Sequence, residues 1–163
     1  MDNMNIFVTS DTHFNHKNII KYCHRPFKDV EEMNEAIISN WNNSVSNDDI
    51  IYHLGDSGFG TKEELKQIFN RLNGQKYLIM GNHDKKAGRN YYLELGFIEV
   101  YRNKCLLDNY ILTHEPINVD KDKINLYGHI HNSDIDPIFD DPNHLCICLE
   151  RTRYKPLLLM RKK

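Results

Sequence analysis

Residues 77–84 read Tyr-Leu-Ile-Met-Gly-Asn-His-Asp, so an apolar run passes directly into a glycine and three polar side chains. A short apolar run with a turn signal at its end is typical of a strand that is buried in a sheet. Glycine suits the turn because it tolerates backbone conformations that other residues avoid. The segment therefore predicts a buried strand that carries polar groups at its carboxyl end.

The same change from an apolar run to polar residues recurs at four other places. The runs and the polar residues that follow them are Ile6–Thr9 with Asp11 and His13, Ile50–Leu54 with Gly55 and Asp56, Tyr110–Thr113 with His114, and Ile124–Tyr127 with Gly128, His129 and His131. In open α/β sheets, ligands bind at the carboxyl ends of the strands. We therefore expect these polar residues to meet at one edge of a sheet.

The remaining apolar runs and the helical patterns define the fold class. Further strands are predicted at Phe97–Tyr101, Cys105–Leu107, Leu145–Leu149 and Leu157–Met160. Helices are predicted over His16–Tyr22 and Arg89–Leu95, from Asp29, and from Thr61 to an end signal at Gly74. Strands that alternate with helices, followed mostly by strands, predict an α/β protein with a largely parallel buried sheet and antiparallel pairing late in the chain.

Composition limits the functional classes. The chain has 163 residues, which predict a single domain over 1–163, and its 40% hydrophobic and 27% charged residues are typical of a globular protein. A formal net charge of -2 argues against nucleic-acid binding through bulk positive charge. No apolar stretch approaches the ~18 residues of a membrane span, and the first residues lack the features of a secretory signal. We expect a cytoplasmic protein with reduced thiols, in which Cys146 and Cys148 share one face of a strand in the core.

Seven polar side chains in the predicted loops are candidate metal ligands. They are Asp11, His13, Asp56, Asn82, His114, His129 and His131. They offer oxygen and imidazole nitrogen but no thiolate, which fits Mn, Fe, Zn, Co or Ni and argues against a structural zinc site. Seven ligands exceed one tetrahedral site, so we expect two adjacent divalent or trivalent transition-metal ions, with Mn favoured and Asp56 as the shared carboxylate. Alternate residues of an extended segment face one side, so both ends of 11–13 and of 129–131 can face the metals.

The motifs Asp-x-His, Gly-Asp, Gly-Asn-His-Asp, His and Gly-His-x-His occur in this order at 11–13, 55–56, 81–84, 114 and 128–131. This series resembles the calcineurin-like metallophosphoesterase superfamily, and the segment after Asp11 resembles small stand-alone members of bacteria and phages. The resemblance implies two packed mixed β-sheets flanked by helices, in a four-layer α/β/β/α sandwich. It also implies two metal sites, one formed by Asp11, His13, His131 and Asp56 and the other by Asp56, Asn82, His114 and His129.

The resemblance implies hydrolysis of a phosphodiester or phosphomonoester by attack of a metal-bridging hydroxide. Two cations would neutralise the phosphate oxygens, orient the ester and lower the pKa of the bridging water. We expect His83 to be the general acid because imidazole can carry a proton near neutral pH, and Asp84 to orient it. Asn15, His16 and Arg25 are the expected substrate contacts.

Two other functions are weighed against this hypothesis. A catalytically silent scaffold of the same fold is the alternative, although the complete ligand set and His83 favour an enzyme. A nucleic-acid-binding module has no motif in its support, whereas a nucleotide or nucleic acid stays open as a substrate. The chain leaves little room for a cap domain, so we expect the substrate to be selected by loops 14–27, 57–60, 85–90, 115–123 and 132–144. His53 is expected to be a packed histidine of the core or one that supports the ligands.

Overall fold

The computed structural model describes residues 4–133 and 141–161, so part of the predicted loop 132–144 lies outside the described residues. Within them the strands are β1 (Asn5–Thr9), β2 (Ile50–His53), β3 (Gln75–Ile79), β4 (Glu99–Tyr101), β5 (Lys104–Leu107), β6 (Tyr110–Thr113), β7 (Ile124–Tyr127), β8 (His144–Cys146) and β9 (Leu157–Arg161). The helices are α1 (Lys17–Tyr22), α2 (Val30–Ser44), α3 (Lys62–Asn70) and α4 (Arg89–Glu94), with 3₁₀ turns η1 (Asp84–Lys86) and η3 (Leu149–Arg151).

The strands form two mixed sheets. The five-stranded sheet has the order β4-β3-β2-β1-β9, and the four-stranded sheet has the order β5-β6-β7-β8. Strands β1 to β4 pair in parallel and β9 pairs antiparallel with β1. In the second sheet β5 and β6 are antiparallel, whereas β6, β7 and β8 are parallel. The predicted parallel sheet and the later antiparallel pairing are therefore confirmed.

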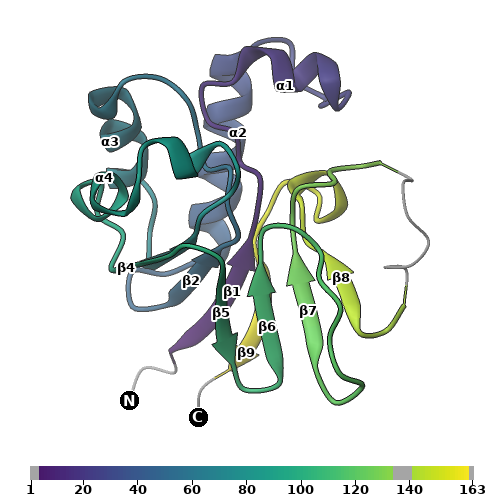
Figure 1. Cartoon of the computed structure of the whole chain (residues 1–163). Helices are drawn as coiled ribbons and strands as arrows, with labels where there is room; N and C mark the ends of the chain where they lie inside the picture. Colours follow the sequence, from purple (N-terminus) through teal and green to yellow (C-terminus); the bar gives the residue numbers. More distant parts are fainter. Residues whose placement is uncertain (1–3, 134–140, 162–163) are drawn as a thin grey trace.

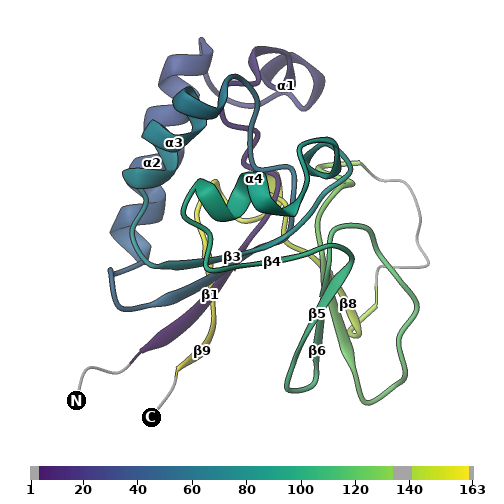
Figure 2. The same cartoon turned by 60° about the vertical axis from the view of Figure 1, so that its left-hand side comes forward.

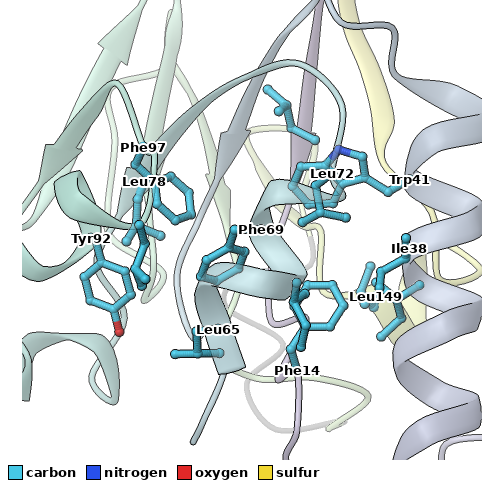
Figure 3. Close-up of a cluster of buried hydrophobic side chains, with 14 of the residues drawn as sticks. Phe14, Ile38, Trp41, Leu65, Phe69, Leu72, Leu78, Tyr92, Phe97 and Leu149 are labelled. Carbon is cyan, nitrogen blue, oxygen red and sulfur yellow. The ribbon is translucent and has the colours of Figure 1, made fainter. Parts of the chain in front are cut away.

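Two hydrophobic clusters hold the layers together. The cluster in Figure 3 lies between the helices and the five-stranded sheet, where Trp41 lies beside Leu72 and the ring of Phe69 meets that of Phe14. A second cluster lies between the two sheets and includes Leu54 and Leu112. Because burying one such side chain stabilises a fold by roughly 1.5–3 kcal/mol, both clusters contribute strongly to stability.

The two mixed sheets and their helices confirm the predicted fold class. In Figures 1 and 2 the α-helices lie on the side of the five-stranded sheet. On the second sheet, the loop residue Ile117 donates its N–H to the side chain of Asn125 on β7. This hydrogen bond holds the loop that follows β6 against the second sheet.

The starts of α2 and α3 follow their local signals, whereas the end of α3 does not. The side chain of Asp29 accepts from the Glu32 N–H at the start of α2, and Thr61 and Glu64 form a complete capping box on α3. The predicted end signal at Gly74 is wrong, because α3 ends at Asn70. Gly74 has φ +91 and brings the chain close to Val45 as it turns toward β3, so the glycine serves the turn and not the helix.

Candidate metal centre

The loops that follow the parallel strands continue the pairing of those strands. Beyond β1 and β2, the N–H of Asp11 donates to the Gly55 carbonyl at 2.9 Å, and the N–H of His13 donates to the Asp56 carbonyl at 3.1 Å. From the other sheet, the N–H of His129 donates to Asp11 Oδ2 at 2.9 Å. The carboxyl ends of both sheets therefore meet at one place, as the sequence predicts.

The first group of predicted ligands gathers around Asp11. Ligand atoms of Asp11, His13 and Asp56 all lie within 4.8 Å of one another. His13 Nε2 is 3.5 Å from Asp11 Oδ1 and 3.8 Å from Asp56 Oδ2. His131 Nε2 is also 3.5 Å from Asp11 Oδ1. The structure thus brings together all four side chains of the first expected site.

The second group gathers on the other side of Asp56. Ligand atoms of Asp56, His114 and His129 lie within 4.8 Å of one another. His114 Nε2 is 3.3 Å from Asp56 Oδ2, 3.2 Å from His129 Nδ1 and 3.0 Å from Asn82 Oδ1. Asp56 belongs to both groups, which is the position that a shared carboxylate needs.

Two buried polar atoms give an independent test of whether these residues fit a cation. Among the described residues, Asp11 Oδ1 and His13 Nε2 are buried and have no hydrogen-bond partner. Leaving such a group unpaired costs roughly 1–3 kcal/mol. Asp11 Oδ2, by contrast, accepts from Ser10 Oγ, from the His129 N–H and from the Cys148 thiol. One oxygen is fully bonded and the other faces His13, so the residues present fit a metal ion.

The charges in the site also fit a cation. Burial alone would raise the pKa of Asp11, but the imidazoles of His13, His114 and His131 hold it well below its usual range. Burial would lower the pKa of His114, but contact with Asp56 and the charge of Asp11 raise it to about 9. Asp11 is therefore anionic at neutral pH. His114 Nδ1 lies 2.7 Å from the Leu54 carbonyl, so Nε2 must lose its proton before it can bind a metal ion. Metal binding is therefore expected to tighten as pH rises.

The backbone at the predicted ligands is not extended. Asp11, His13, Asp56, His129 and His131 have φ of 57, 49, 55, 70 and 52, in the left-handed region. The segments are therefore not extended as predicted, although Asp11 and His13 still come together at the site. Asp and His are among the residues that tolerate this conformation best, and such backbone clusters at functional sites.

His83 and Asp84 lie in different environments. The side chain of His83 is 42% exposed, its Nε2 lies 3.9 Å from Asp56 Oδ2, and its backbone N–H donates to Asp56 Oδ1. Asp84 is buried, and its carboxylate accepts from the backbone N–H groups of Asp56 and Gly81 and from the hydroxyl of Tyr92. Its described bonds thus tie two site loops together, and they do not support the prediction that Asp84 orients His83.

The three residues predicted to contact the substrate also lie in different environments. His16 lies at the site, with its Nδ1 3.0 Å from His13 Nδ1. Arg25 is buried, pairs with Glu150 at 2.9 Å, and donates to the carbonyls of Asp11 and Thr12. Its guanidinium is therefore occupied inside the protein, and the prediction that Arg25 contacts the substrate is not supported.

Asn15 is engaged with neighbouring loops. Its Nδ2 donates to the Phe59 carbonyl, and its Oδ1 accepts from Asn34 on α2. Asn15 therefore fixes the position of the 57–60 loop.

Several supporting residues have no motif in the sequence. Glu150 Oε1 lies 2.9 Å from His131 Nδ1, and a carboxylate in that place fixes the orientation of a ligand imidazole. Cys148 follows the end of β8 and lies beside Asp11, so it does not share a strand with Cys146 as predicted. Glu150 could be found only through its contacts, since 125 residues separate it from Arg25.

His53 connects two site loops beneath the ligands. Its Nδ1 accepts from the Gly55 N–H at 3.1 Å, so its Nε2 carries the proton and donates to Thr12 Oγ1 at 2.9 Å. Thr12 in turn donates to the Ser57 carbonyl. The predicted role of a packed, supporting histidine agrees with this placement.

The fold and the paired clusters define a two-sheet α/β protein with a candidate dinuclear metal site at the edge of its sheets. A family model described as calcineurin-like phosphoesterase matches residues 4–157. The chain therefore belongs to the calcineurin-like phosphoesterase family. Among the described residues, no helix has both the length and the apolar character that crossing a bilayer requires.

Relatives and a solved structure agree with this family. An uncharacterized protein of Methanocaldococcus jannaschii is 37% identical over 162 residues, covering 94% of this chain and 86% of that protein. The Gene 66 protein of Mycobacterium phage L5 is 35% identical over 83 residues, covering 49% of this chain and 40% of that protein. The crystal structure of a protein of unknown function from Aquifex aeolicus superposes with a TM-score of 0.76 at 28% identity, covering 95% of each chain.

Proposed function

We propose that this protein is a dinuclear metal-dependent phosphoesterase that hydrolyses a phosphodiester or phosphomonoester. The observation that carries the proposal is the place of Asp56, which belongs to both ligand groups and lies 3.9 Å from the proposed acid His83. Asp11, His13, His131 and Asp56 would hold one ion, and Asp56, Asn82, His114 and His129 the other. When bound, two such ions neutralise phosphate oxygens, orient the ester and lower the pKa of a water.

The protein residues around this site each have a task. His83 is partly exposed and held beside Asp56 through its own backbone, so it can reach the substrate. As water adds to phosphorus and the bond to the leaving oxygen breaks, His83 would give that oxygen a proton. Asp84 and Glu150 position the loop of Asp56 and the ring of His131.

Metal removal and replacement test the proposal. Protein stripped with a chelator should lose hydrolysis of bis(p-nitrophenyl) phosphate and p-nitrophenyl phosphate, and Mn, Fe, Co, Ni or Zn should restore it as two ions bind per chain. His83→Ala should keep both ions and lose about 10²–10⁴-fold in kcat on an alkyl ester, whose leaving oxygen needs a proton most. Two bound ions without turnover of any ester would favour the silent scaffold, and a variant with full activity would remove His83 from the reaction.

A further inference from the structure

Phe59 places an apolar ring among the imidazoles of the site. Its ring centroid is 5.8 Å from that of His13 with an interplanar angle of 17°, 4.3 Å from that of His16 and 5.1 Å from that of His83. The ring centroid of His16 also lies 6.3 Å from that of Tyr22. We call Phe59, His16 and Tyr22 the aromatic wall. The wall begins at a predicted metal ligand and at the proposed acid, so it borders the place where an ester would react.

The wall takes no part in the hydrophobic clusters of the described residues. Phe59 is half-buried and belongs to no hydrophobic cluster of the described residues, although large apolar rings are normally used to fill a core. Tyr22 is 67% exposed. Tyr22 thus presents an exposed ring beside His16, and Phe59, whose ring contacts imidazoles of the site, is only partly covered.

The backbone of Phe59 is fixed on both sides. Its N–H donates to the Phe14 carbonyl at 2.8 Å, and its carbonyl accepts from Asn15 Nδ2 at 3.1 Å. Asn34 on α2 holds Asn15 through two hydrogen bonds. At Gly58, an added Cβ would come within 2.7 Å of Leu65, so the loop also packs closely on α3. A ring on such a support is positioned before a ligand arrives, which lowers the entropy cost of binding.

The geometry points to a nucleoside phosphate ester as the substrate, with its planar base stacked on the aromatic wall while its phosphate lies at the metal centre. This inference rests on the proposed function and names its substrate class. Stacking of a base on an aromatic side chain contributes about 1–3 kcal/mol and does not depend on the base. Lys17 and Lys85 are exposed and follow His16 and His83 closely in the chain, and their positive charge suits an anionic ligand.

A pair of substrates that differ only in the base tests the inference. We would compare kcat/KM for the methyl ester of AMP with that for the methyl ester of ribose 5-phosphate, using the protein loaded with Mn. The ratio should be about 5- to 150-fold in favour of the nucleoside ester, which is the stacking free energy expressed as a rate ratio. Phe59→Leu should bring the ratio toward one, whereas Phe59→Tyr, which keeps the ring, should preserve it.

The metal content of each variant separates stacking from disturbance of His13. If Phe59→Leu binds two ions like the parent and the ratio still falls, the planar ring carries the preference. A ratio near one in the parent, with both esters hydrolysed, would overturn the inference and leave the proposed function intact.

A binding measurement keeps the inference testable if neither ester is hydrolysed, a result that would count against the phosphodiester part of the proposed function. Calorimetry would then compare AMP with ribose 5-phosphate as ligands of the Mn-loaded protein. Tighter binding of AMP that Phe59→Leu abolishes would support the wall, and equal affinities would overturn it.

Discussion

The hydrophobic cluster beneath the helices and the inner part of the candidate metal centre are both buried, but one consists of apolar side chains and the other of charged and polar ones. The first packs apolar side chains such as Trp41 and Phe69 on regular elements, and it gains about 25 cal/mol for each Å² of apolar surface removed from water. The second buries carboxylates and imidazoles on left-handed loops, with Asp11 Oδ1 and His13 Nε2 unpaired among the described residues. The comparison teaches that the core stabilises an arrangement which the site loops would not adopt alone.

The largest effect is expected from a substitution that removes the shared carboxylate. Asp56→Asn should lose metal ions and reduce turnover by about a thousandfold or more, because bound ions contribute several kcal/mol of transition-state stabilisation. Metal analysis and a phosphoesterase assay measure both effects. Asp29→Asn is the matched control, since Asn caps a helix about as well as Asp and the site lies elsewhere. Two ions retained in Asp56→Asn would contradict the shared role.

The second prediction concerns the apolar region. Phe69→Ala should lower the free energy of unfolding by about 3–5 kcal/mol, because Phe69 is 1% exposed and its removal leaves a cavity. Denaturant titration measures the loss, and the folded variant should still bind the parent's number of ions. Leu106→Ala, at a side chain that is 66% exposed, should change stability by only about 0.5 kcal/mol. A folded Phe69→Ala protein with an altered metal count would show that the two regions are not separate.

The smallest effect concerns a residue that supports the centre from outside. Glu150→Gln should weaken metal binding by about 10- to 100-fold, because the carboxylate orients His131 and offsets the charge of Arg25. Competition with a chelating dye measures this affinity. Glu35→Gln makes the same change in the exposed pair with Arg71, where it should leave metal affinity as it was. Equal effects of the two substitutions would argue against positioning by Glu150.

What could be predicted from sequence was largely what local signals determine. Asp29 and Thr61 cap their helices within one helical turn, so the starts of α2 and α3 could be predicted from the sequence. The end of α3 could not be predicted from Gly74, because this glycine belongs to a later turn that packs on Val45. The strand predicted over Leu145–Leu149 was too long, because the chain enters η3 at Leu149.

The candidate ligands could be predicted because each follows a strand, and strand ends meet at one edge. The side chains around them could not, because their partners are remote in the chain. Arg25 looked like a basic group near the motif loops, but a carboxylate 125 residues away and two carbonyls hold it inside. Asp84 adjoins His83 in sequence, yet its hydrogen bonds go to Asp56 and Gly81.

Segments that are far apart in the sequence close the candidate centre, which has a consequence for its assembly. Asp11 near the start receives hydrogen bonds from His129 and Cys148, which are 118 and 137 residues further on, and β1 pairs with β9. Contacts of such long range form late, because the loops between them must first be closed. The candidate metal centre is therefore expected to form only once residues through Cys148 are present, and a fragment that stops before His129 should lack it.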